Sequence, residues 1–292
     1  MSRFERLGRL NIKLVWVVVL LSMLAPAFIK FELPVKISPM TVDFYEFFEN
    51  LPEGQIVYIM NSHSLMSYYP LKGAMKLTLQ FLMEHNAKFV IQALVAESPV
   101  TYSDWMEAAD PESYGYEYGV DYVLFGYLAG GEMALASFAA DIWKTYDTDY
   151  YGNKLSDLPL MENIHSWEDF DVALGSASSC VLQDMFVRQW CAEGKQNPID
   201  DPYGSKLATA YIPQSTCAPN TVPYLGVNPG IHVMIYGTQG AAELEAVANR
   251  LGHSTALANA KNLGIIVNVG LIILGNIAYF SAKFSKKEEI KQ

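Results

Sequence analysis

Residues 114–143 read YGYEYGVDYVLFGYLAGGEMALASFAADIW, and the order of residue types in this stretch decides the fold. A β-rich run at residues 120–127 is followed by a flexible pair, Gly130 and Gly131, and Glu132 then opens a strongly helical run. At least four other stretches repeat this order. Apolar strands that alternate with helices predict a mostly parallel sheet with helices on both faces, which is an α/β, Rossmann-like fold.

The predicted α/β domain covers residues 55–252, with no boundary that would divide it. Its six expected strands are residues 55–61, 87–95, 120–127, 170–174, 206–212 and 231–236. Its expected helices are residues 71–85, 102–109, 132–146, 180–193 and 238–251. A connector at residues 31–54, with a possible short helix, precedes the domain.

Two apolar runs flank this domain, and we predict transmembrane helices at residues 10–30 and 262–283. The second run, LGIIVNVGLIILGNIAYFSA at residues 263–282, holds twenty residues without a charge, which matches the ~20 residues of a membrane span. The first, LVWVVVLLSMLAPAFI at residues 14–29, is shorter. A cleaved signal peptide ending near Ala25–Pro26–Ala27 is the alternative interpretation of the first run.

The basic residues of the chain gather at its ends and predict its orientation in the membrane. Residues 31–261 hold 11 of the 20 Lys and Arg and 28 of the 31 Asp and Glu, so this middle part carries 11 − 28 = −17. Basic flanks favour the cytoplasmic side. We therefore expect both termini inside the cell and an acidic domain outside it, with membrane lipid around the helices. Such a domain repels nucleic acid and anionic headgroups, so neither is an expected partner.

The last apolar run also predicts an assembly face. Gly264, Asn268 and Gly275 are spaced by four and seven residues and so share one side of a helix. Small and polar residues at such spacing allow helices to approach and to form hydrogen bonds in lipid. We expect this face to pack against the first span, against another copy of the chain in a homo-oligomer, or against another membrane subunit. The alternative is a single span that tolerates a few polar residues.

Ligands of parallel α/β sheets bind at the carboxyl ends of strands, where the strand order reverses. The residues that we expect at a ligand site there are His63, Glu97, Gly130, Gly131, Glu132, Ser176, Ser178, Thr216 and Gly237. Small polar residues leave helix N–H groups free to hold an anion or a carbonyl group. Helix caps and tight turns have the same composition, and they are the alternative explanation.

The motifs of common cofactor and catalytic sites do not occur in the sequence. It has no GxGxxG fingerprint, no GxxxxGK[ST] phosphate loop, no GxSxG nucleophile elbow and no metal-ligand spacing of histidines. We therefore predict no cofactor and no metal. The long segment at residues 213–230 is the first candidate for a lid or a partner contact.

Three cysteines are too few for a disulfide framework. Cys180 and Cys191 share one expected helix and would lie roughly 16 Å apart, too far to bond. A Cys180–Cys217 bond is geometrically open, and three buried thiols are the alternative.

Three segments together carry a resemblance to a family. They are YGYEYGVDYVLFGYLAGGEMAL at 114–135, TDYYGNKLSDLPLMENIHSWEDFDVAL at 148–174 and CAPNTVPYLGVNPGIHVMIYGTQGAAELE at 217–245. The chain resembles a family of uncharacterised prokaryotic membrane-anchored proteins with YGxDYVxLGYxxGGE, TDxYG and GAAEYE motifs. It departs from the pattern at Leu244, where the family has tyrosine, and at Ala129, where proline is common. The resemblance implies an architecture and no activity.

The sequence favours a binding or assembly module of a membrane complex over an enzyme. One alternative is a membrane-tethered hydrolase, because AGGEMALASFAADI faintly resembles the glycine-rich helix start of ClpP/crotonase-like serine peptidases. Those proteins place a serine where this chain has Gly131 or Glu132, so their nucleophile is absent here, and only labelling by a serine probe that is lost in Ser98→Ala or Ser178→Ala would revive this alternative. The other alternative is a solute-binding or sensor domain that signals through the spans.

Overall fold

The structure is a computed structural model that describes residues 11–28, 36–192 and 194–289. The chain divides into two compact units. One is Val35–Ser254, which holds the α/β domain. The other combines Met1–Pro34 with Thr255–Gln292 and holds two apolar helices.

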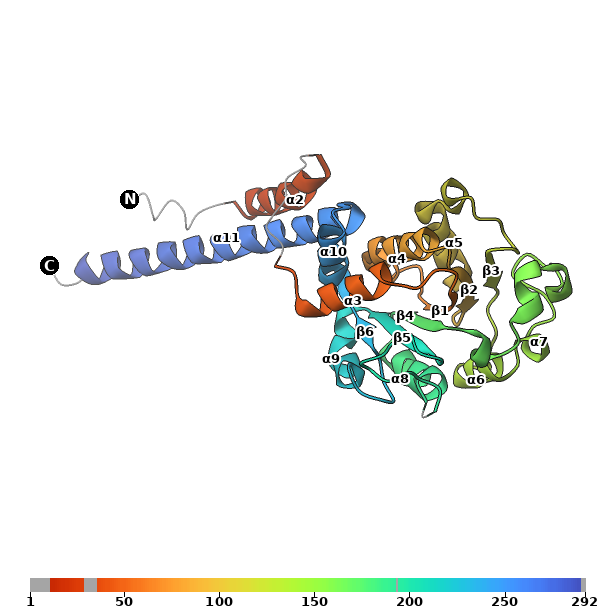
Figure 1. Cartoon of the computed structure of the whole chain (residues 1–292). Helices are drawn as coiled ribbons and strands as arrows, with labels where there is room; N and C mark the ends of the chain where they lie inside the picture. Colours follow the sequence, from red (N-terminus) through yellow and green to blue (C-terminus); the bar gives the residue numbers. More distant parts are fainter. Residues whose placement is uncertain (1–10, 29–35, 193, 290–292) are drawn as a thin grey trace. The chain divides into compact units, whose positions relative to one another are not determined.

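The α/β domain is built on a six-stranded sheet in which all neighbouring strands are parallel, in the order β3-β2-β1-β4-β5-β6 (Figure 1). The strands are β1 (Ile56–Ser62), β2 (Lys88–Ala93), β3 (Tyr122–Phe125), β4 (Val172–Ala177), β5 (Ala208–Pro213) and β6 (Val233–Met234). The strand order reverses between β1 and β4, as in a doubly wound Rossmann sheet. The predicted α/β class and the parallel sheet are therefore confirmed.

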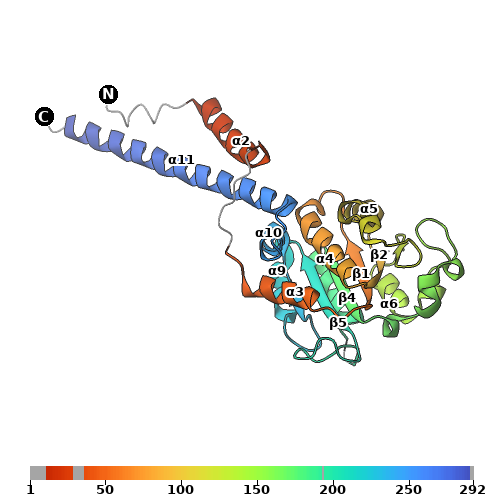
Figure 2. The same cartoon turned by 45° about the horizontal axis from the view of Figure 1, so that its top comes forward.

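Helices cover both faces of the sheet. Successive strand side chains point to opposite sides, so each strand contributes to a hydrophobic cluster on either face. Val57 and Ile59 pack into one hydrophobic cluster, and Tyr58 and Met60 pack into another. The helices on the first side are α3 (Pro39–Glu49), α4 (Lys72–Glu84), α5 (Ser98–Ala109) and α10 (Gly237–Val247); those on the second are α6 (Glu132–Ala140) and α8 (Cys180–Trp190) (Figures 1 and 2). Near the middle of the second cluster Tyr58 stacks on Trp190 with ring centroids 3.6 Å apart.

Three expected elements differ from the observed ones. The helix expected at 132–146 is split into α6 and the short α7 (Ile142–Thr145), because the Asp141 side chain accepts a hydrogen bond from the Lys144 N–H and starts a new helix. The expected sixth strand keeps only two paired residues. The segment 213–230 is not an open loop, since it contains η6 (Ser215–Cys217), α9 (Ala218–Thr221) and η7 (Val222–Tyr224).

Short 3-10 helices fill the remaining connections. They are η1 (Tyr69–Leu71), η2 (Pro111–Tyr114), η3 (Leu155–Asp157), η4 (Pro159–Asn163) and η5 (Trp167–Asp169). The last three lie in the polar stretch between α7 and β4; η3 contributes Leu155 to the second cluster, and η4 contributes Leu160 and Met161.

The second unit contains α2 (Ile12–Phe28) and α11 (His253–Glu289). Within the described residues, one helix is long and apolar enough to cross a membrane, and it lies at His253–Ser281. It begins nine residues before the expected boundary at 262. Helix α2 is also apolar, but its 17 residues make it shorter than a full span. Residues 1–10, which include the predicted basic flank Arg3, Arg6 and Arg9, lie outside the described part of the chain.

The predicted packing face on α11 is not uniform. A methyl group at Gly264 would lie 3.1 Å from Cγ of Met23 in α2, so this glycine allows the two apolar helices to approach each other. The Asn268 side-chain amide donates to the Gly264 carbonyl of its own helix. A methyl group at Gly275 would meet nothing within 4 Å.

Candidate functional site

The switch point of the sheet brings together His63 and Ser176, two of the residues predicted for a ligand site. His63 directly follows β1, Ser176 lies in β4, and both are completely buried. The His63 Nε2 atom lies 2.8 Å from Ser176 Oγ, and Ser176 Oγ donates to the Ile212 carbonyl at 3.2 Å. Since that hydroxyl has a single proton, His63 Nε2 donates to it. Nδ1 is then a bare acceptor, and burial lowers the pKa of His63 to about 3, so the ring is neutral.

Three buried polar atoms at the end of β1 have no hydrogen-bond partner among the described residues. They are Asn61 Oδ1, Ser62 Oγ and His63 Nδ1. The Trp105 ring lies 5.4 Å from the His63 ring, and its Nε1 is also without a described partner. An unpaired buried polar group is costly, and buried groups of folded proteins nearly always find a protein or water partner. Because successive strand side chains point to opposite sides of the sheet, Asn61 and Ser62 do not share one face, and these atoms mark separate places for ordered water.

Helices that begin at the carboxyl ends of the strands lack side-chain caps. Helices α5, α6, α8 and α10 all start without a side-chain hydrogen bond to their first turn. By contrast, Ser38 caps α3 and Asp141 caps α7. The interpretation of the small polar residues as helix caps is therefore wrong for these four helices. Several of their first N–H groups are bonded to backbone carbonyls instead, including those of Ser98 and Val100 in α5, Met133 in α6 and Leu182 in α8.

Glu132 begins α6, but its carboxylate is already bound. Arg188 donates to it twice, through Nε at 2.8 Å and through a terminal nitrogen at 2.7 Å, and the Gln189 amide donates at 3.0 Å. The Arg188 guanidinium holds the pKa of Glu132 at about 2. The neighbouring Gly130 and Gly131 have φ of +136° and +55°, which favours glycine at this turn. These three residues form a structural corner between α6 and α8.

The other predicted residues lie along the same edge without converging on one point. Glu97 is exposed, and its carboxylate accepts the Leu65 N–H at 2.6 Å. Ser178 donates to the Ser62 carbonyl at 3.2 Å, and the Thr216 side chain is exposed.

Gly237 starts α10 with φ of +60°. A methyl group there would collide with Ser215 Oγ, so the glycine lets η6 and α10 lie side by side. Ser98, the other candidate nucleophile, is fully buried and donates to the Asn61 carbonyl.

A disulfide joins Cys180 at the start of α8 to Cys217 in η6, with their Cα atoms 4.9 Å apart. It ties the beginning of the segment 213–230 to the carboxyl end of β4. Cys191 is a buried thiol, and burial raises its pKa. The alternative of three buried thiols is therefore wrong. Disulfides persist mainly in oxidising compartments.

Large apolar side chains are exposed in the segments that follow the strands. They are Leu65, Met66, Val100, Tyr127, Met133 and Val181, and Met66 is 93% exposed. All six follow the carboxyl end of β1, β2, β3 or β4. Singly exposed apolar side chains are normal on a protein surface, and only a contiguous patch of them would indicate an interaction surface.

Two glutamates of the GAAELE segment have a role that the sequence analysis missed. The Glu243 carboxylate accepts the Ser38 N–H at 2.9 Å and the Thr41 hydroxyl at 2.8 Å at the start of α3. The Glu245 carboxylate accepts the backbone N–H groups of Gly252, which precedes α11, and of Ser254, in the first turn of α11. Acidic residues at buried positions of a helix were the available signal. Both segments that leave the α/β domain are thus fixed to α10.

No described group of three or more His, Cys, Asp or Glu side chains could hold a metal ion. No family model and no curated protein matches the chain. Among solved structures, a trehalose-6-phosphate synthase, OtsA, is similar with 14% identity and a TM-score of 0.27 over 86% of this chain. The match covers 47% of that enzyme, about half its length. So low a similarity supports no statement about activity.

Proposed function

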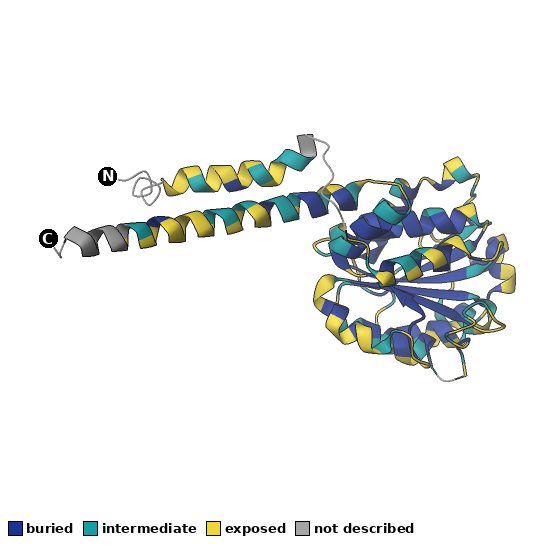
Figure 3. Ribbon diagram, turned by 60° about the vertical axis from the view of Figure 1, so that its left-hand side comes forward, coloured by how far each residue is buried: buried dark blue, intermediate teal, exposed yellow. Residues whose placement is uncertain are grey.

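We propose that this chain is a membrane-anchored binding module, with its α/β domain displayed outside the cytoplasm as part of a membrane complex. The observation that carries the proposal is the apolar surface of α11, which is open along the candidate span (Figure 3). Its exposed apolar side chains include Ile265, Ile266, Val269, Ile272, Ile273 and Ile277. An uncovered surface of this kind is stable in lipid and unstable in water.

Two further features support two spans with the domain outside. Helix α2 also exposes apolar side chains, among them Ile12, Trp16 and Leu20, and Met23 lies against Gly264 of α11. A short span of 17 residues is accommodated by local thinning of the bilayer or by snorkelling of flanking basic residues. The Cys180–Cys217 disulfide suits an oxidising, extracytoplasmic compartment.

The binding surface that we propose is the carboxyl edge of the sheet. The uncapped helices α5, α6, α8 and α10, the unpaired atoms at the end of β1 and the exposed apolar residues all lie along this edge. An edge that combines exposed apolar side chains with polar groups suits a ligand or partner that is partly apolar and partly polar.

The orientation is tested by labelling intact cells with a membrane-impermeant thiol reagent. Ser156→Cys places a thiol at an exposed position of the α/β domain, and Lys283→Cys places one beyond the candidate span. The native thiol Cys191 is buried and gives little background. We expect the thiol at position 156 to react on intact cells, and the thiol at position 283 to react only after permeabilisation. The reverse pattern contradicts the orientation.

Assembly is tested by blue native electrophoresis in a mild detergent. The two glycines of the predicted face have different surroundings. Gly264 lies against α2, whereas a methyl group at Gly275 would have no atom within 4 Å. Gly275→Leu should therefore change the oligomer, whereas Gly264→Leu should separate the two helices of one chain. Asn268→Leu should have the smallest effect, because its amide is satisfied within α11. A wild-type chain that migrates only as a monomer contradicts the assembly part.

A sensor function is the second candidate. Glu245 of α10 binds the residues that lead into α11, so a displacement of α10 would be transmitted to the candidate span. Among the described residues nothing favours a hydrolase, since the hydroxyls of Ser98 and Ser178 donate to backbone carbonyls. Labelling by a serine-reactive probe that disappears in Ser98→Ala or Ser178→Ala would revive that alternative.

A further inference from the structure

A pocket of about 260 Å³ lies between α4 and the segment that leads from α10 to α11. Its α4 wall is formed by Lys72, Gly73, Lys76, Leu77 and Gln80, and its other walls by Glu245 and residues 250–253. Every lining residue belongs to the α/β domain or to its last connection. The pocket is therefore a property of that unit alone.

The lining is basic although the domain is acidic. Lys72, Lys76 and Arg250 are three of the 11 cationic residues in the 231 residues of the middle part. Lys72, Lys76 and Gln80 are spaced four residues apart on α4, so they share one face of the helix. Three cations therefore line one pocket of a domain whose net charge is −17, together with the carboxylate of Glu245.

The cations of this pocket differ in what they already bind. Lys72 forms an ion pair with Asp104 at 2.7 Å, and Arg250 forms a two-point pair with Glu84 at 2.7 and 3.0 Å. Lys76 is half-buried and has no ion pair or hydrogen bond among the described residues. Its ammonium group is thus available to a ligand, with Lys72 one turn away.

The acidic lining residue, Glu245, is held by the backbone of the connection. Both oxygens of Glu245 accept backbone N–H groups, from Ser254 at 2.8 Å and from Gly252 at 2.9 Å. A methyl group at Gly73 would lie 2.0 Å from Ser254 Oγ and 2.5 Å from the Glu245 carboxylate. Glycine at position 73 therefore allows the connection to lie directly on α4 and to shape the wall.

The position of the pocket in the chain indicates where its ligand comes from. Residues 250–253 form one wall, and His253 is also the first residue of α11 and of the candidate span. Its Nε2 lies 3.3 Å from the Tyr69 carbonyl, so this end of the connection is held at the domain. Because the pocket is close in sequence to the candidate span, lipid headgroups on the same side of the membrane are the source of phosphate that we consider first.

We infer that this pocket binds a phosphate group, with Lys76 as the principal contact and Lys72 as the second, and that an anionic lipid headgroup supplies it. The phosphate site rests on the pocket alone, and only the choice of a lipid rests on the proposed membrane anchoring. The acidic domain as a whole repels an anionic surface, so the site would select single headgroups and would not hold the domain flat on the bilayer.

The test measures binding of dihexanoyl phosphatidylglycerol to the full chain in detergent, by native mass spectrometry or thermophoresis. We expect Lys76→Gln to weaken binding roughly fivefold, the usual contribution of one basic residue to an anionic headgroup. Lys76→Arg should retain the charge and the binding. Lys206→Gln is the matched control, because Lys206 is an exposed lysine whose ammonium group has no described partner.

The remaining arms distinguish the sources of the phosphate. A short-chain diacylglycerol, which has no phosphate, should not bind in a way that depends on Lys76. Glycerol 3-phosphate that binds as tightly as the lipid, with the same loss in Lys76→Gln, supports the phosphate site and assigns it to a soluble ligand. Equal lipid binding by the wild type and Lys76→Gln, or an equal loss in Lys206→Gln, overturns the inference. None of these arms depends on membrane insertion, so their outcome is separate from that of the proposed function.

Discussion

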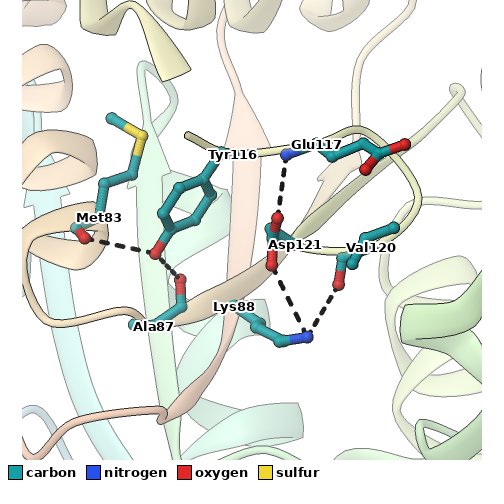
Figure 4. Close-up of polar contacts among 7 residues, drawn as sticks. All are labelled: Met83, Ala87, Lys88, Tyr116, Glu117, Val120 and Asp121. Atoms are coloured by element: carbon teal, nitrogen blue, oxygen red, sulfur yellow. Dashed lines mark hydrogen bonds and ion pairs between the residues drawn. The ribbon is translucent and has the colours of Figure 1, made fainter. Parts of the chain in front are cut away.

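The amino edge and the carboxyl edge of the parallel sheet are built differently. At the amino ends of β2 and β3 the polar groups are paired: Lys88 contacts the Val120 carbonyl at 3.1 Å and Asp121 at 3.7 Å, and the Tyr116 hydroxyl donates to the Ala87 carbonyl at 2.9 Å (Figure 4). At the carboxyl end of β1, buried polar atoms have no described partner, and helices α5 and α8, which follow β2 and β4, start without a side-chain cap. The polar groups described at the amino end are therefore paired within the chain, whereas those at the carboxyl end of β1 are left unpaired.

A disulfide links two segments at the carboxyl edge of the sheet. The Cys180–Cys217 disulfide closes a sequence separation of 37 residues, for which chain entropy predicts a stabilisation of about 3–4 kcal/mol. We expect Cys180→Ser with Cys217→Ser to lower the free energy of unfolding by this amount in urea titrations. Wild type with a reductant serves as the control and should match the variant. An unchanged unfolding midpoint would show that this edge is held by other contacts.

His63 gives the carboxyl end a pH dependence. Its folded-state pKa of about 3 lies below the ~6.5 of an unfolded histidine. The folded state thus binds fewer protons between these values, and stability is complete above pH ~6.5 and falls as the pH drops toward 3. The slope is about 1.4 kcal/mol per pH unit, or about 2 kcal/mol at pH 5.

The check for His63 is a comparison of stability–pH profiles of wild type and His63→Gln. The carboxylates titrate in both proteins, so the difference between the profiles isolates the histidine. We expect the variant to lose less stability between pH 7 and pH 5. Parallel profiles would mean that His63 takes up a proton in the folded state, and hence that water reaches the carboxyl edge.

The alternation of residue types was enough to predict the α/β class and most elements to within a few residues. It could not predict the strand order, because pairing of β1 with β4 joins Asn61 to Ser176 across more than a hundred residues. His63 and Ser176 were singled out separately, but their contact depends on that pairing. Glu132 was placed correctly at a helix start, yet its partner Arg188 lies 56 residues away on another helix. Local patterns predict elements and candidate residues, whereas the combination of residues depends on the tertiary fold.

Tyr116→Phe tests the amino edge. The change removes a hydroxyl that donates to the Ala87 carbonyl and leaves the ring on Phe89 in place. One hydrogen bond of this kind contributes about 1 kcal/mol, so we expect that loss in the free energy of unfolding. Tyr151→Phe is the control, since Tyr151 is 61% exposed and the same change there should be neutral. A neutral Tyr116→Phe would weaken the contrast between the two ends.

Ser62→Ala is the matched change at the carboxyl edge, and we expect no loss of stability from it. Ser62 is fully buried and its hydroxyl has no described partner, so removing that hydroxyl relieves an unpaired polar group and is neutral or slightly stabilising. The contrast with Tyr116→Phe is the point of the experiment, because both changes delete one hydroxyl near the end of a strand. If Ser62→Ala instead costs about 1 kcal/mol or more in the ligand-free protein, an ordered water must bind the hydroxyl there. If it costs nothing but weakens binding of whatever occupies the carboxyl edge, the hydroxyl is kept for that ligand.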